Sequence, residues 1–169
     1  MLCCIGDLVE DVVVWPKGPP QRGTDTPARV YRRRGGSAAN VAVLAIEAGG
    51  RSRFIGQVGD DRLGRLLVEE MRDCGVDMKV VRDGRTGTVV VLVEPDGERT
   101  MLPDRSAATQ LSAVPEGSLG GAGWMHIPGY SLVVEPLATT SRRLAAQARR
   151  VMIPLSIDAS STGLIEAFG

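Results

Sequence analysis

The sequence is poor in the residues that mark several classes of protein. Only 4% of its 169 residues are aromatic, it has one histidine, and 20 basic residues balance 20 acidic ones. Such a chain lacks both the positive charge and the stacking surface of a nucleic-acid-binding protein. It has no run of about 18 apolar residues, as a membrane span needs, and its apolar beginning lacks the basic segment of a signal peptide. We therefore expect a cytoplasmic protein that binds neither nucleic acid nor membranes.

The three cysteines form no metal-binding or redox pattern. Cys3 and Cys4 are adjacent in an apolar run, and Cys74 falls in a helical pattern. Because neither a C-x-x-C pair nor a ligand spacing for a metal is present, buried and reduced thiols are expected, and no metal site is predicted.

Apolar periodicity predicts strands that alternate with helices. Strands are expected at residues 2–5, 9–15, 28–33, 53–58, 88–94, 99–102, 124–127 and 151–157, and helices at 37–48, 63–74 and 135–150. The turn Pro95-Asp96-Gly97-Glu98 between two β-rich runs predicts a hairpin. The alternation favours an α/β fold, with a parallel sheet between helices and a small accessory β-layer. Since the chain stops in SSTGLIEAFG, at the expected start of a helix, it is expected to be truncated.

The segment RGGSAANVAV, residues 34–43, carries the strongest local signal. Gly35 and Gly36 allow the backbone to approach a ligand, and Ser37 is expected to cap the following helix. Asn40 brings an amide with donors and an acceptor into the first turn of an otherwise apolar helix. A polyol supplies partners for both; the alternative is an asparagine that satisfies nearby backbone groups. The segment is neither a dinucleotide fingerprint nor a P-loop, since G-x-G-x-x-G and G-K-[ST] are absent.

These features resemble the ribokinase-like (PfkB) carbohydrate kinases. The stretch from Gly35 to Gly59 is similar to the first signature of that family, and GDLVEDVVV (6–14) to its first strand and the start of its lid. The segments VGDDRLGRLL, TGTVVVLVEPDGERTML and GYSLVVEP of this chain resemble further segments of the family, and they occur in the same order. The resemblance implies a three-layer, Rossmann-like and mostly parallel sheet with helices on both faces and a small β-sheet lid. Residues 1–169 would be the N-terminal part of one such domain, with lid strands near 9–15, 28–34 and 86–102.

The resemblance also implies which residues bind substrate. Asp11 would accept hydrogen bonds from adjacent sugar hydroxyls, and Gly35, Gly36 and Asn40 would contact the sugar. Arg99 would reach the substrate or its phosphate from the lid, with a solvated lid edge as the alternative. Asp104 and Arg105 would likewise reach the substrate or its phosphate, or else belong to a solvated lid edge. Tyr130 and Glu135 would border the site.

The other charged residues near these motifs are expected to have structural or solvated roles. Asp7 is expected to support the site from behind or to form a turn, and Glu10 to point away into solvent. The run Arg32–Arg34 is expected to be the solvated end of a strand. Val9 stands where ribose-type relatives carry Asn, which disfavours ribose as the ligand.

The implied activity is phosphorylation of a sugar hydroxyl by ATP with Mg²⁺. The family's catalytic G-A-G-D segment is absent, because Trp124 follows Gly121-Ala122-Gly123 where the aspartate would stand. The chain is therefore expected to supply the sugar-binding half and the lid, to contain no catalytic residue, and to transfer no phosphate alone. The alternative is a non-catalytic sugar- or nucleoside-binding or dimerisation module from a truncated kinase gene. Lid strands of many relatives pair between subunits, which implies a possible homodimer.

Overall fold

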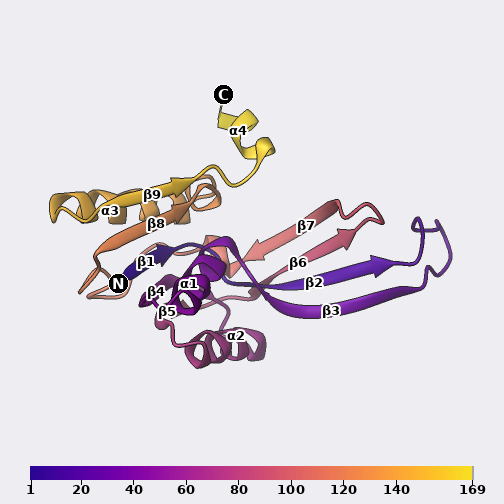
Figure 1. Cartoon of the computed structure of the whole chain (residues 1–169), viewed down its shortest axis with the longest axis horizontal. Helices are drawn as coiled ribbons and strands as arrows, with labels where there is room; N and C mark the ends of the chain where they lie inside the picture. The colour runs from indigo at the N-terminus through magenta and orange to yellow at the C-terminus, as the bar shows by residue number, and fades with distance from the viewer. Residues whose placement is uncertain (169) are drawn as a thin grey trace.

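The computed structural model describes residues 1–168. The chain forms two β-sheets, one of five strands and one of four. The larger sheet has the order β5-β4-β1-β8-β9, and each neighbouring pair is parallel. The smaller sheet has the order β3-β2-β6-β7 and extends away from the larger one (Figure 1). The strands are β1 (Leu2–Ile5), β2 (Val9–Pro16), β3 (Ala28–Gly35), β4 (Ser52–Val58), β5 (Asp77–Arg82), β6 (Thr86–Val93), β7 (Arg99–Ser106), β8 (Trp124–Pro128) and β9 (Leu155–Asp158).

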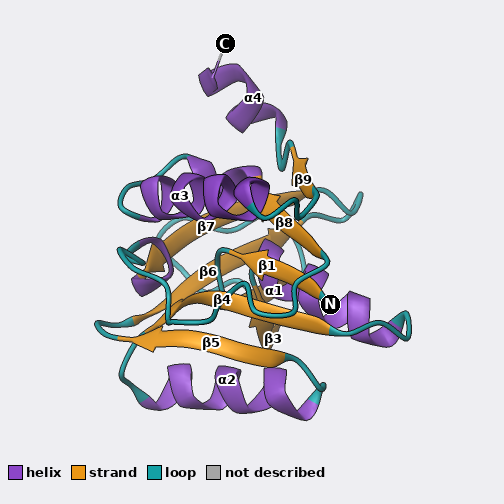
Figure 2. Ribbon diagram, turned by 90° about the vertical axis from the view of Figure 1, so that its left-hand side faces the viewer, coloured by secondary structure: helices purple, strands orange, loops and turns teal. Residues whose placement is uncertain are grey.

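Helices cover both faces of the larger sheet. The helices are α1 (Ser37–Glu47), α2 (Arg62–Asp73), α3 (Leu137–Arg150) and α4 (Thr162–Phe168), with short 3₁₀ turns at Ala107–Thr109 and Gly129–Leu132. Cys4 and Phe54 join the apolar cluster beneath α1 and α2, whereas Cys3 and Ile55 join the cluster beneath α3. Because side chains alternate along a strand, the adjacent cysteines enter two different cores. Figure 2 shows α2 and α3 on opposite sides of the strands. The α/β class expected from the sequence is confirmed.

The smaller sheet contains the strands expected to form a lid. Residues 9–15 and 28–34 lie in β2 and β3, and residues 86–102 form β6, the turn at 94–98 and the start of β7. Its own apolar cluster is made by valines of β2 and β6, such as Val13 and Val91, with Ala108 beside them. The predicted hairpin is present, because Gly97 N donates to Glu94 O at 2.9 Å and Glu94 N to Glu98 O at 2.8 Å.

Several element boundaries differ from those expected. Strand β5 was not predicted, because its apolar residues are interspersed with Asp77, Lys79 and Arg82. The last strand covers only residues 155–158, since the preceding Pro154 has no N–H for a ladder and Met152 has a φ of 58°. The expected capping role of Ser37 is wrong. The helix begins at Ser37, and Gly36 is its N-cap without a side-chain hydrogen bond.

Within residues 1–168, no helix is long and apolar enough to cross a membrane.

Candidate functional site

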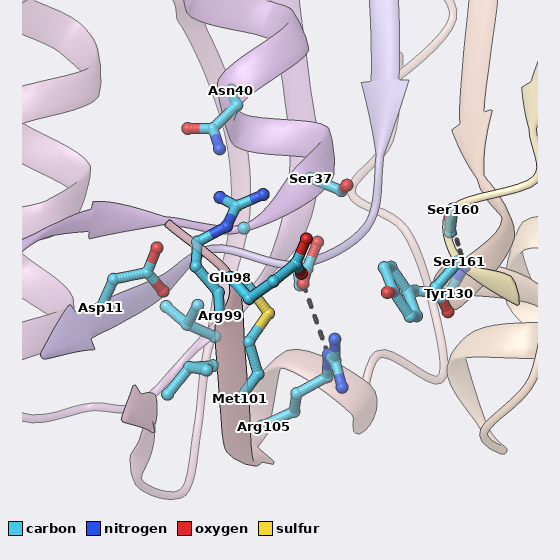
Figure 3. A pocket seen from close by; sticks show the side chains of 14 residues that line it. Asp11, Ser37, Asn40, Glu98, Arg99, Met101, Arg105, Tyr130, Ser160 and Ser161 are labelled. Atoms are coloured by element: carbon cyan, nitrogen blue, oxygen red, sulfur yellow. Dashed lines mark hydrogen bonds and ion pairs between the residues drawn. The ribbon is translucent and has the colours of Figure 1, made fainter. Parts of the chain in front are cut away.

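A cleft of about 410 Å³ lies between the smaller sheet and the start of α1. It begins where β1 leaves the parallel sheet, and segments that follow β8 and β9 close it from the other side. Ligand sites of open parallel sheets form at this end of the strands. Figure 3 shows side chains from α1, the smaller sheet and the 130 and 160 segments directed into the same space.

Asp11 lies in the cleft because β2 carries alternate side chains to opposite faces. The neighbouring Gly35 is required for this placement, since a Cβ on it would lie 2.2 Å from Asp11 Oδ1. Burial raises the pKa of the Asp11 carboxyl above its ordinary value, and the negative charge of Asp7 adds to this effect. The positive charges of Arg33 and Arg105 act in the opposite direction. Gly35 itself does not line the cleft; it leaves room for the carboxylate.

Gly36 brings the start of α1 against the segment that follows β1. Its φ of 104° is one that residues with a side chain rarely adopt, and a Cβ would lie 2.3 Å from the backbone oxygen of Asp7. The glycine therefore lets the first turn of α1 approach Asp7 closely. As a result Ser37 and Asn40, both on this turn, line the same cleft as Asp11.

Asn40 is exposed to the cleft, and among residues 1–168 its side chain has one polar partner. Its Oδ1 accepts a hydrogen bond of 2.8 Å from Nη1 of Arg34, the penultimate residue of β3. The amide is thus held by a side chain and does not satisfy backbone groups, which was the simpler alternative. The observed position is one from which the amide can reach a ligand.

A partly buried ion pair lines the cleft. Asp7 is only 5% exposed, and its Oδ2 lies 3.5 Å from Nε of Arg105. The Arg105 guanidinium is 4.6 Å from the centre of the Tyr130 ring, a distance suited to a cation–π contact. Asp7 itself lines the cleft, so it stands in the wall of the site and not behind it as expected. Arg105 and Tyr130 both line the cleft, whereas Asp104 turns outward to pair with Arg85.

Arg99 reaches the cleft from β7 (Figure 3). Within residues 1–168 its side chain has no ion-pair or hydrogen-bond partner, in contrast to Arg105. Glu98 and Met101 of the same β6–β7 hairpin also line the cleft. A charged donor without a partner at a site wall is free to bond a polar ligand.

Two acidic residues behave differently from expectation. Glu10 is not solvated: it is 8% exposed, and its Oε2 accepts a 2.7 Å hydrogen bond from Arg32 on the neighbouring strand. Glu135 does not border the cleft. Its Oε2 accepts from Thr139 N at 2.9 Å at the start of α3, and it pairs with Arg142. Glu135 therefore stabilises a helix end.

Some cleft residues were not found from the sequence. Ser160 and Ser161 line the cleft, and the Ser160 hydroxyl donates to Asp158 at the end of β9 at 2.7 Å. Their signal was their position directly after a parallel strand. The cleft thus offers carboxylate acceptors, amide and guanidinium donors, and hydroxyls, a set suited to a hydroxylated ligand. Within residues 1–168, no group of three or more His, Cys, Asp or Glu side chains could hold a metal ion.

Known proteins provide an independent comparison. Residues 1–162 match the family described as pfkB family carbohydrate kinase. A fructokinase of Klebsiella pneumoniae is 33% identical over 142 residues, and a fructokinase of Zea mays is 36% identical over 131 residues. These alignments cover 81% and 73% of the chain but 43% and 41% of the relatives. The chain therefore spans less than half the length of these curated relatives.

Solved structures of the same fold give a similar coverage. The adenosine kinase of Sinorhizobium meliloti superposes with a TM-score of 0.82 at 21% identity, over 99% of this chain and 58% of that one. A sugar kinase of Pyrococcus horikoshii in complex with ATP gives a TM-score of 0.81 at 22% identity, over 95% of this chain and 53% of that one. These similarities show the fold.

Proposed function

The chain belongs to the pfkB family of carbohydrate kinases, and we propose that it holds the sugar on which an ATP-dependent kinase acts. The observation that carries this proposal is the convergence of Asp11 and Asn40 on one cleft. They come from different elements, β2 and α1, and bring an acceptor and an amide to the same ligand. The cleft volume of about 410 Å³ lies in the range of small-molecule sites.

We assign each cleft residue a role in binding. The ionised Asp11 carboxylate accepts hydrogen bonds from two adjacent hydroxyls, and the Asn40 amide bonds a neighbouring oxygen. Gly35 and Gly36 make this approach possible by leaving out side chains that would fill the space. Arg99 closes over the ligand from the lid. Fructose is the first ligand to test, because several relatives are named fructokinases.

The chemistry of phosphoryl transfer lies beyond the residues of this cleft. ATP would supply the phosphoryl group and Mg²⁺ would neutralise charge on it. The 169 residues contain no G-A-G-D segment, which carries the catalytic aspartate in the family's pattern. We therefore assign to this chain the binding and orientation of the sugar, and propose that the 169-residue chain transfers no phosphate.

The proposal is tested by measuring binding and turnover on the same preparation. Isothermal titration calorimetry with fructose, ribose and adenosine should show binding of at least one of the three, and Asp11→Ala should abolish it. A coupled assay of ADP release with ATP, Mg²⁺ and each sugar should stay at background. Turnover above background would contradict the assignment of no transfer. Binding that survives Asp11→Ala would contradict the proposed site.

We further propose that the lid pairs with the lid of a second copy. One face of the smaller sheet carries an apolar surface formed by Val12, Val14, Val30, Val90, Leu92 and Leu102, which the strand register places together. Val30 is 57% and Leu102 is 56% exposed. An exposed apolar sheet face of this kind is typical of an interface. Sedimentation should show a dimer that Leu102→Asp converts to a monomer; a monomeric wild-type chain would refute this pairing.

A further inference from the structure

Arg34 connects the cleft to the rest of the fold. Besides its hydrogen bond to Asn40 Oδ1, its Nε lies 3.6 Å from Oε1 of Glu70 on α2. The side chain is 14% exposed, although its place in an arginine run predicts a solvated group. One guanidinium therefore contacts residues of both α1 and α2 from the end of β3.

The chemistry of this pair fixes which end of the amide faces the cleft. A guanidinium has N–H donors and no acceptor, so it can bond only the oxygen of a carboxamide. The Nδ2 group of Asn40, with its two donors, is then left for a ligand. Figure 3 shows this nitrogen directed toward the other labelled side chains and the oxygen turned aside.

We propose that Arg34 is a positioning residue that holds the Asn40 carboxamide so that the cleft receives N–H donors and not the oxygen. This inference rests on the proposed sugar site. Ionised Asp11 can only accept hydrogen bonds, and Asn40 so held presents its two N–H donors to the cleft while its oxygen bonds Arg34. The pair therefore selects ligand hydroxyls, which donate to Asp11 and accept from Asn40. A ligand group that only donates has no partner at Asn40.

The variant Asn40→Asp tests the orientation directly. It keeps an oxygen for Arg34 and replaces the donor toward the cleft with an acceptor. We expect the urea midpoint to be unchanged or higher, because an ion pair replaces the hydrogen bond. The Kd for fructose should rise by about thirtyfold or more. If Asn40→Asp binds fructose within about threefold of wild type, the oxygen serves the ligand and the proposal is overturned.

The role of Arg34 is tested by a double-mutant cycle for binding. Arg34→Met removes the donors but keeps the apolar stem, and should weaken fructose binding by about tenfold. Arg34→Lys retains a donor and should restore most of the affinity. In an Asn40→Ala background, Arg34→Met should have no further effect on Kd. Equal weakening in both backgrounds would mean that Arg34 acts only through the general structure, which would overturn the proposal.

Arg29→Met is the matched control. Arg29 is an exposed arginine on the same strand, and within residues 1–168 its side chain makes no hydrogen bond or ion pair. Its substitution removes the same charge and should leave the Kd for fructose within about twofold of wild type. A tenfold loss in Arg29→Met would attribute the effect of Arg34→Met to net charge and overturn the proposal.

A cycle without ligand separates this inference from the proposed function. The folding equilibrium constants of wild type, Arg34→Met, Asn40→Ala and the double variant are measured in urea. The double variant should lose about fivefold less than the product of the two single losses. If Arg34 and Asn40 are coupled in folding but the chain binds no sugar, the sugar site is refuted and the Arg34–Asn40 contact is still supported. Strict additivity would overturn the positioning role whatever the titration shows.

Discussion

Gly36 is the position at which the structure allows the sharpest test of how the cleft is built. Alanine there would have to adopt a φ of 104°, and its Cβ would lie 2.3 Å from Asp7 O, 2.8 Å from Asp7 C and 3.1 Å from Leu8 Cα. These are backbone atoms, so they can move only if the connection between β1 and β2 moves. The unfavourable φ costs about 1–3 kcal/mol and the overpacking about 1–3 kcal/mol. The lower entropy of the unfolded alanine chain returns about 0.5–1 kcal/mol. Gly36→Ala should therefore lower the free energy of unfolding by about 3 kcal/mol.

Two other glycines serve as comparisons in urea unfolding followed by circular dichroism. Gly49 has a φ of 82° and no atom within 4 Å of its added Cβ, so Gly49→Ala should show the conformational cost alone, about 1 kcal/mol. Gly35→Ala collides with the Asp11 carboxylate, a side chain that can rotate away. It should cost less stability than Gly36→Ala but should abolish sugar binding. If Gly36→Ala is no more destabilising than Gly49→Ala, the close approach to Asp7 is not a real constraint and the reasoning fails.

Three further substitutions test separate parts of the structure. Asp11→Asn should stabilise the chain at pH 7, because burial raises the pKa of the Asp11 carboxyl. The wild type loses stability as the pH rises from the unfolded pKa of 3.8 through the higher folded pKa. The urea midpoints of the two proteins should therefore converge as the pH is lowered toward 4. Arg53→Met should lower the free energy of unfolding by about 3 kcal/mol, since Arg53 bonds Asp77 and the carbonyls of residues 117, 118 and 120; a urea midpoint equal to wild type would refute this. Asp61→Ala should cost about 2 kcal/mol at pH 7, because its carboxylate accepts from Gly64 N and from both Thr86 N and Thr86 Oγ1. A loss equal to that of the exposed Asp60→Ala would contradict it.

The elements that could be predicted from the sequence are those in which local pattern and tertiary environment agree. Residues 2–5 and 53–58 are short apolar runs, and they form the buried centre of the parallel sheet. The Pro-Asp-Gly turn requires a hairpin by its own conformational preference, and the hairpin is present. β5 was missed because its strand is half exposed, and its charged residues hide the apolar alternation.

Parts of the candidate cleft could be predicted where the backbone itself is constrained. Gly35 and Gly36 were recognisable because only glycine leaves space at these points, and Asn40 because an amide in an apolar helix needs partners. Arg34 and Glu10 were assigned to solvent because their partners, Asn40 and Arg32, are brought to them by strand register and helix packing. Register depends on pairings distant in sequence, and a single sequence does not specify them.

The central claim is that Asp11 and Asn40 bind one polyhydroxy ligand in the cleft. Chemical-shift mapping by ¹⁵N NMR of the 169-residue chain during a titration with fructose tests it most directly. We predict that the largest shifts cluster at Gly36, Ser37, the Asn40 side-chain amide and Arg99. Saturable shifts confined to other parts of the chain, with the Asn40 amide unmoved, would contradict the account.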